Sequence, residues 1–184
     1  MKQLSTKRTV LRVFRMRDTQ DFYDYAKNPM VGPMAGRKPH ESIEESEALL
    51  KKFIDDDQIW AIEERESGRM IGTVGLHPDV KRGRDFERVR MLGYGLDEPY
   101  WGRGMMPEVC REVLRYAFEE LKLELVSVVH YPFNGRSKRV IEKLGFHYEG
   151  FLRAATVLPN GEVTDDICYS MTREEYQQMY VSGE

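Results

Sequence analysis

Hydrophobic residues recur with two different periods along this chain, and together the two periods predict one sheet covered by helices. Alternation of apolar and polar residues predicts strands, whereas apolar residues spaced three or four apart predict helices. The predicted strands are residues 9–15, 59–63, 70–76, 85–96, 123–130, 151–158 and 163–171. The predicted helices start at residues 18, 42, 107 and 137 and end near residues 27, 53, 121 and 144. This order predicts a mixed α/β sheet with helices packed on it.

Single residues mark where several of these elements begin and end. Asp18 can cap the first helix, and the run Ser42-Ile43-Glu44-Glu45 is a capping box for the second. Pro107 suits the first position of the third helix, because its missing N–H would have no partner there. Gly145 can end the fourth helix, and Asn160-Gly161 predicts a hairpin turn.

The link between the fourth predicted strand and the third predicted helix suggests a chemical role. Residues 99–108 read Pro-Tyr-Trp-Gly-Arg-Gly-Met-Met-Pro-Glu, so two glycines stand immediately before a helix start. Backbone N–H groups at a helix start have no partner inside the helix, and the helix dipole attracts anions there. The run lacks the Gly-Lys-Ser/Thr ending of a Walker loop and the third glycine of a dinucleotide fingerprint. It predicts either a cradle for a phosphorylated cofactor or a tight turn that caps a core helix.

Composition and charge narrow the class of protein. The 184 residues suit a single domain spanning 1–184, and 41% hydrophobic residues are enough for a core. A net charge of −3 argues against a general nucleic-acid binder. No apolar run approaches the roughly 20 residues that cross a bilayer, and the first residues lack the apolar stretch of a signal peptide. We therefore expect a cytoplasmic protein that binds neither nucleic acid nor a membrane.

Cysteine and histidine positions predict no metal site. Cys110 and Cys168 lie far apart and lack metal-ligand spacing, so we expect two reduced thiols. The four histidines form no ligand pair at helical spacing.

Several short segments occur together in an order that is typical of one enzyme family. They are Leu92-Gly93-Tyr94, the run 100–106, Arg115-Tyr116-Ala117-Phe118, Asn134-Gly135-Arg136-Ser137, Glu142-Lys143-Leu144-Gly145-Phe146, Glu149-Gly150, Asp165 and Tyr169-Ser170. With the opening segment 7–12, they resemble the GNAT N-acetyltransferases, in particular the ribosomal-protein-alanine N-acetyltransferases and their bacterial relatives. The resemblance implies a twisted, mostly antiparallel sheet with splayed central strands and about four flanking helices.

The resemblance also implies acetyl-CoA as co-substrate and assigns residues to it. The loop of Trp101, Gly102, Arg103, Gly104, Met105 and Met106 would bind the pyrophosphate through its backbone. The strand end at Gly95-Leu96 would pair with the pantetheine amides, and its N–H groups could stabilise the thioester oxyanion. Asn134 would contact the cofactor or cap the next helix, and the two roles are compatible. The Arg103 side chain is either a further contact or a solvated loop arginine.

Acetyl transfer to an amine requires a neutral amine, a stabilised oxyanion and an acid for the departing thiolate. The resemblance suggests Ser137 as that acid; otherwise Ser137 is a first-turn helix serine. Many relatives carry Glu where this chain has Met91, so a direct carboxylate base is in doubt. Glu87, Asp85 and Glu149 remain candidates that would act through a water molecule, and each can equally be a solvated surface carboxylate.

The acceptor is the least determined part of the sequence analysis. Residues 28–40 could line its groove, and the basic run Lys81-Arg82-Gly83-Arg84 could meet an acidic peptide or simply be solvated. We expect an N-acetyltransferase that acts on a protein N-terminus, with a polyamine, an aminoglycoside-type amine or another small amine as alternative acceptors. A non-catalytic acyl-CoA-binding module is the competing class, and the resemblance makes a homodimer an expectation.

Overall fold

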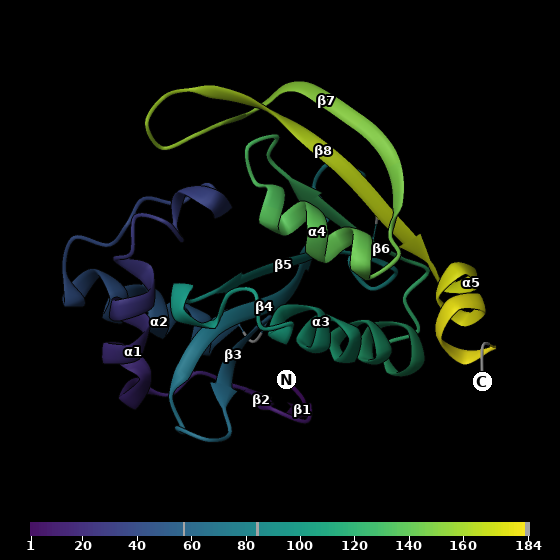
Figure 1. The fold of residues 1–184 in the computed structure, drawn as a ribbon. Coiled ribbons are helices and arrows are strands. Elements are labelled where there is room, and N and C mark those ends of the chain that lie inside the picture. Colours follow the sequence, from purple (N-terminus) through teal and green to yellow (C-terminus); the bar gives the residue numbers. More distant parts are fainter. Residues whose placement is uncertain (57, 84, 183–184) are drawn as a thin grey trace.

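The computed structural model describes residues 1–56, 58–83 and 85–182. The strands are β1 (Leu4–Ser5), β2 (Thr9–Arg12), β3 (Ile59–Glu64), β4 (Met70–Pro78), β5 (Val89–Leu96), β6 (Leu125–His130), β7 (His147–Val157) and β8 (Val163–Thr172). The helices are α1 (Thr19–Ala26), α2 (Ile43–Asp56), α3 (Met105–Arg115), α4 (Gly135–Lys143) and α5 (Arg173–Tyr176). One sheet joins the eight strands in the order β1-β2-β3-β4-β5-β6-β8-β7 (Figure 1), which confirms the predicted fold class.

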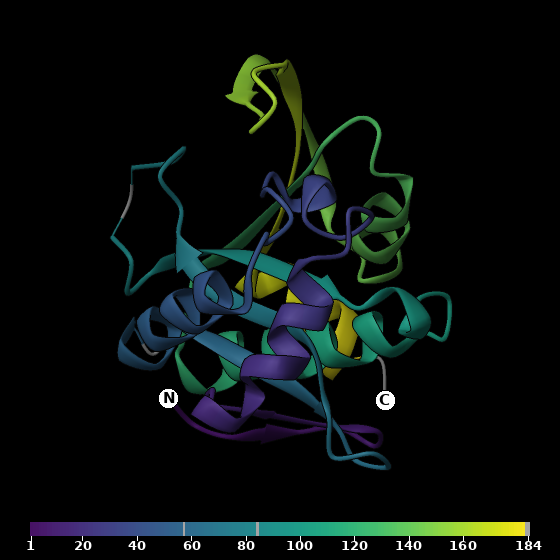
Figure 2. The same cartoon turned by 90° about the vertical axis from the view of Figure 1, so that its left-hand side faces the viewer.

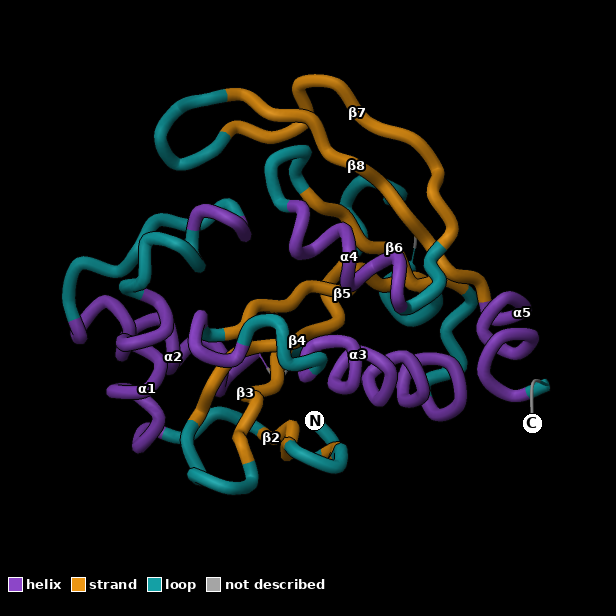
Figure 3. The backbone as a smooth tube through the Cα atoms, viewed as in Figure 1, coloured by secondary structure: helices purple, strands orange, loops and turns teal. Residues whose placement is uncertain are grey.

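The centre of the sheet is where its strands separate. Neighbouring strands pair antiparallel except β5 and β6, which are parallel and paired only from Val89–Leu125 to Met91–Ser127. Beyond Met91, β5 stays beside β4, while β6 follows β8. Figure 3 shows the two strands diverging, with α3 and α4 near the opening. The structure thus contains the splayed pair that the resemblance implied.

Each face of the sheet carries its own hydrophobic core. On one face, α3 and the π-helical segment that continues it (Tyr116–Glu120) bury the predicted stripe of Val109, Val113 and Ala117 against the sheet. On the other face, a second core is centred on Phe22 of α1 and Leu50 of α2. Figure 2 turns α1 and α2 toward the viewer. Helices α3 and α4 therefore lie on one face of the splayed strands, and α1 and α2 lie on the other.

Several strand boundaries differ from the sequence prediction, among them the start of β7, which lies at His147 instead of residue 151, and two of the differences have a clear local reason. The first strand ends at Arg12 instead of residue 15, because the buried Arg12 guanidinium bonds Asp18 at 2.7 Å and 2.8 Å and the chain turns there. The fourth predicted strand starts at Val89 instead of residue 85, because the N–H of Val89 donates to the Asp85 carbonyl and closes a turn.

The helix starts also differ in detail from prediction. Asp18 holds the cap position of α1 but uses its carboxylate on Arg12 and on the Arg15 N–H. Ser42 does accept the Glu45 N–H at 3.3 Å, whereas the Glu45 carboxylate accepts from Glu41 rather than closing the box.

The third helix begins at Met105, two residues before Pro107. Proline costs nothing at this position either, since N–H groups throughout the first turn lack helical partners. A short strand at the N-terminus and helix α5 at the C-terminal end were not predicted.

Candidate active site

A cleft of about 630 Å³ opens between the splayed strands β5 and β6 and the starts of α3 and α4. Every predicted cofactor residue lines it except Arg103, whose guanidinium lies 5.5 Å from the centre of the Tyr100 ring. The described lining contains the cations Arg136, Arg139 and Lys143 and no carboxylate. The cleft is therefore suited to an anionic ligand with an apolar portion.

The backbone at the start of α3 is arranged to receive an anion. Gly102 and Gly104 have φ of 73° and 71°, a left-handed conformation that glycine adopts readily. Among the described residues, the N–H groups of Gly102 through Met106 have no hydrogen-bond partner in the protein. A side-chain carbon added to Gly102 would meet open space, so a ligand can approach the backbone closely.

Arg8 fixes this loop from behind. Its Nη1 donates to the Arg103 carbonyl at 2.8 Å, and its Nε donates to the Glu108 carboxylate at 2.8 Å. The Arg8 backbone N–H bonds the same carboxylate at 3.0 Å. The loop that carries the free N–H groups is therefore tied to the first strands and to the body of α3.

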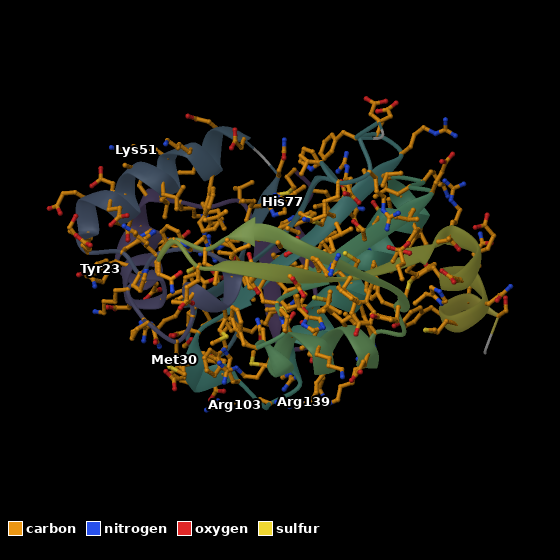
Figure 4. The ribbon with its side chains drawn as sticks, turned by 90° about the horizontal axis from the view of Figure 1, so that it is seen from above. Tyr23, Met30, Lys51, His77, Arg103 and Arg139 are labelled. Atoms are coloured by element: carbon orange, nitrogen blue, oxygen red, sulfur yellow. The ribbon has the colours of Figure 1, made fainter. Side chains whose placement is uncertain are left out.

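Helix α4 supplies the positive wall of the cleft. The Arg136 guanidinium lies 3.9 Å from the centre of the Trp101 ring, and the indole Nε1 donates to the Leu96 carbonyl at 2.7 Å. Arg139 and Lys143 follow on the same side of the helix. Figure 4 shows Arg103 and Arg139 along one side of the molecule. The sequence analysis missed this wall, although spacings of three and four residues indicate one helix face.

Asn134 joins two parts of the cleft. Its Oδ1 accepts the Ser137 N–H at 3.1 Å, so it caps α4 as the sequence suggested. Its Nδ2 donates to the Met34 carbonyl at 3.0 Å, which ties residues 31–38 to the helix start.

Ser137 lies inside the cleft with a defined hydroxyl partner. Its Oγ is 2.8 Å from the Tyr94 phenol oxygen, and both residues line the cleft. Burial raises the pKa of Tyr94, which keeps the phenol protonated. The Ser137 hydroxyl can therefore donate its proton while it stays hydrogen-bonded to the Tyr94 phenol. A general acid that protonates a departing thiolate needs such a proton and such a partner.

The structure does not bring the proposed carboxylates into the described lining of this cleft. Glu87 is exposed before β5, where its N–H donates to Asp85. Glu149 bonds the Ser170 hydroxyl at 2.8 Å and pairs with Arg82. It lines a second cavity of about 250 Å³ that also contains Lys81 and Arg82; Arg84 of the basic run lies outside the described residues.

The two cavities share Met91 and Val129, the residues just at and beyond the end of the β5–β6 pairing. The side chains of Val126 and Val128 pack toward α3, whereas Ser127 and Val129 alternate to the other face. The second cavity therefore opens on the face opposite α3 and meets the cleft at the apex of the splay.

The face of β5 opposite α3 carries few side chains, because two of its residues are glycines. Gly93 and Gly95 point there, and a side chain on Gly95 would collide with the Tyr25 hydroxyl. Arg37 donates to that hydroxyl at 3.2 Å, and His77 lies over Gly93. Burial, and secondarily the nearby Arg37 charge, lowers the pKa of His77.

Comparison with known proteins agrees with this geometry. Residues 8–147 match the acetyltransferase (GNAT) domain family. The chain is 30% identical over 175 residues to the N-acetyltransferase YoaA of Bacillus subtilis, which covers 92% of this chain and 96% of that protein. A GNAT-family acetyltransferase structure from Bacillus anthracis superposes with a TM-score of 0.85 at 21% identity, over 95% of this chain and 100% of that one. The ribosomal-protein-S5-alanine acetyltransferase structure from Vibrio fischeri gives 0.75 at 20% identity, over 96% and 99%.

The chain belongs to the GNAT acetyltransferase family. It is an acetyl-CoA-dependent N-acetyltransferase. The described lining of the cleft combines unpartnered N–H groups, cations and apolar residues between two strands. In the described ranges, no three His, Cys, Asp or Glu side chains gather as metal ligands do. Nor do those ranges contain a helix whose length and apolar character would let it span a bilayer.

Proposed function

We propose that this chain, as one domain of residues 1–184, moves an acetyl group from acetyl-CoA to a protein N-terminal α-amino group by direct attack in a ternary complex. The observation that carries the proposal is the row of unpartnered N–H groups from Gly102 to Met106 at the mouth of a cationic cleft. Direct transfer requires both substrates to be held together, and no covalent intermediate.

The cofactor is proposed to run along the splay from α3 toward Met91. Its pyrophosphate meets the N–H groups at the start of α3, and its pantetheine arm follows β5 from Leu96. The five residue steps from Leu96 to Met91 cover about 17 Å at the strand rise of ~3.4 Å per residue. The thioester then lies at the apex of the splay, and Ser137 supplies the proton for the departing thiolate.

Two observations support an α-amino acceptor. An α-amino group has a pKa of about 7.7–8.0 and a lysine amine about 10.4, so the former is far easier to deprotonate in a cleft whose described lining has no carboxylate. The exposed side chains Phe151 and Leu152 border the second cavity and can cover the apolar parts of a peptide. The structural resemblance to an enzyme described as a ribosomal-protein-S5-alanine acetyltransferase is consistent with such an acceptor. The homodimer stays a prediction.

The test is a thiol-release assay with acetyl-CoA and two acceptor sets, followed by mass spectrometry for one added acetyl group. One set is short peptides with free N-termini and varied first residues; the other is polyamines and aminoglycosides. Faster turnover of peptides is expected. Turnover of the small amines alone would show that the acceptor is a small amine and not a protein N-terminus. Acetyl-CoA binding without turnover of either set would favour a non-catalytic acyl-CoA-binding module.

A further inference from the structure

We propose that His77 is the general base that takes the proton from the attacking amine. The inference rests on the proposed acetyl transfer and adds the group that the sequence did not identify. It places the base on β4, the strand beside β5, and on the face of the sheet opposite α3.

The strand register puts His77 next to the reacting centre. His77 pairs with Met91 across β4 and β5, and Met91 is the last β5 residue paired with β6. The imidazole leans over Gly93, with its Nε2 3.0 Å from the point that a side-chain carbon of Gly93 would occupy. Both Met91 and Gly93 line the cleft, so the ring stands directly across one strand from the proposed thioester position.

Two glycines make this approach possible. Nε2 is also 3.0 Å from the corresponding point at Gly75, which pairs with Gly93. A side chain at either position would press on the ring. The two glycines therefore leave room for the imidazole to lie against β5, where the side chain is partly exposed.

Two other histidines each use a ring nitrogen in a hydrogen bond within the described part of the protein, whereas His77 uses neither. His40 Nδ1 bonds the Ser46 hydroxyl at 2.6 Å, and His130 Nδ1 bonds the Tyr131 carbonyl at 2.8 Å. Within the described chain, neither nitrogen of His77 has a hydrogen-bond partner, and the side chain is partly exposed. A catalytic base must keep one nitrogen lone pair available, and both His77 and His130, whose buried Nε2 has no partner among the described residues, do so. The register that places His77 opposite Met91 is what favours His77.

The surroundings keep the ring neutral at physiological pH. Among the described residues, the charge that acts on the ring is that of Arg37, from the 31–38 loop, which also donates to the Tyr25 hydroxyl of α1. Met91 and Gly93 of β5 and Gly75 of β4 lie beside the ring. Burial and the Arg37 charge lower the pKa of His77 below the usual 6.5. A neutral imidazole is the form that accepts a proton.

The step balances without a further reactant. The amine nitrogen forms a bond to the acetyl carbon, and one amine proton moves to His77. The carbon–sulfur bond then breaks, and the thiolate takes a proton from Ser137. Proton transfer from the His77 imidazolium to solvent, and from solvent to Ser137, restores both groups.

The test compares the pH dependence of kcat/KM for the acceptor in the wild type and in His77→Gln, at saturating acetyl-CoA. L-alaninamide and an alanine-initiated tetrapeptide serve as acceptors. Below the pKa of His77, two groups must lose protons in the wild type, the acceptor ammonium and the imidazole. The logarithm of the rate constant should then fall with a slope of about 2 per pH unit, against about 1 in His77→Gln. At pH 7 the variant should be slower by about 10²-fold.

Two histidine variants serve as comparisons. His147→Gln, at the exposed start of β7, should keep the wild-type slope and rate. His130→Gln tests the histidine that lines the cleft itself, and a slope change in that variant but not in His77→Gln would assign the base to His130 and overturn the proposal. Thermal melting and the dissociation constant of acetyl-CoA show whether His77→Gln is folded and loaded.

The outcomes separate the two proposals. Wild-type turnover with an unaltered slope in a folded, cofactor-binding His77→Gln protein would reject the base and leave the acetyltransferase proposal standing. Absence of wild-type turnover on every acceptor would reject the proposed function and the base with it.

Discussion

Helices α3 and α4 begin on two sides of the same cleft, yet their first turns are completed differently. At the start of α3, Gly104 is left-handed and has no side chain to cap the helix, so the N–H groups there have no partner in the part of the chain that the structure describes. At the start of α4, the Asn134 side chain accepts the Ser137 N–H and holds the turn internally. A helix start that the protein leaves open can bind a ligand, whereas one that it caps can position a side chain.

The difference assigns separate tasks to the two helices. The open start of α3 is proposed to determine cofactor affinity, since its N–H groups and dipole act on the pyrophosphate. The capped start of α4 fixes Ser137 against Tyr94 and is proposed to determine the rate of proton delivery. Substitutions at the two starts should therefore affect different measurements.

The largest expected effect is at the open start. Gly104→Glu places a carboxylate where the pyrophosphate is proposed to bind, and the dissociation constant of acetyl-CoA should rise by at least about 100-fold, or ~2.7 kcal/mol. Isothermal calorimetry measures it.

The matched control for this substitution is Gly68→Glu. Gly68 has a φ of 69° in the β3–β4 turn, so both variants carry similar backbone strain and the same new charge. Equal affinities for Gly104→Glu and the wild type, or equal losses in the two variants, would contradict the open-start site.

The next effect is at the capped start. Ser137→Ala removes the proposed thiolate acid, and kcat should fall by about 10²-fold while acetyl-CoA affinity stays within about twofold. Stopped-flow thiol release measures kcat, and Ser42→Ala at the start of α2 is the control for losing a helix-start serine. A Ser137→Ala enzyme with the wild-type rate and pH profile would remove Ser137 from the mechanism.

Variants of Asn134 can separate the effects of its two hydrogen bonds, the one that caps α4 and the one to the Met34 carbonyl. Asn134→Ala should destabilise the protein by about 1 kcal/mol, the usual cost of a lost helix cap, measured by urea unfolding. Asn134→Asp keeps an acceptor for the Ser137 N–H and should recover most of that loss, but it cannot donate to the Met34 carbonyl.

Hydrogen exchange distinguishes these two Asn134 variants. In residues 31–38, amide hydrogen exchange should be faster in Asn134→Ala and in Asn134→Asp than in the wild type. Wild-type exchange there in Asn134→Asp would show that the Met34 contact does not hold the loop.

The smallest effect is expected at the positive wall. Arg136→Gln should weaken acetyl-CoA binding by about threefold at low salt, and the loss should shrink as salt rises, because a partly solvated charge is screened. Arg153→Gln, on the exposed part of β7, is the control. A loss that is independent of salt would point to the Trp101 stacking contact rather than to charge.

Local sequence patterns predicted the elements around the cleft well. The stripe of Val109, Val113 and Ala117 identified α3 because burial of one helix face depends on spacing within the helix. The Asn134 cap was predictable for the same reason, since its partner is three residues away. Helix α5 was missed although Thr172 and Glu175 form a capping box, because the segment after it has no long apolar stripe.

The rest of the site depends on contacts between distant segments. Tyr94 meets Ser137 from another element, and His77 lies over Gly93 only because β4 and β5 pair in one register. Asp18, predicted as a helix cap, instead pairs with Arg12 once that guanidinium is buried. The spacing of residues along the chain does not predict which register two strands adopt. Nor does it predict which of two possible partners one carboxylate binds.

The tie from Arg8 has a practical consequence for shortening the chain. The N-terminal residues look dispensable because β1 has two residues and most of its neighbours are polar. Deleting residues 1–8 would nevertheless release the Arg103 carbonyl and leave the partly buried Glu108 without its arginine. A truncated protein would also lose Leu4 from the core on the α3 side and would hold the turn before α3 less rigidly, so crystallisation and ligand-screening work should retain this segment.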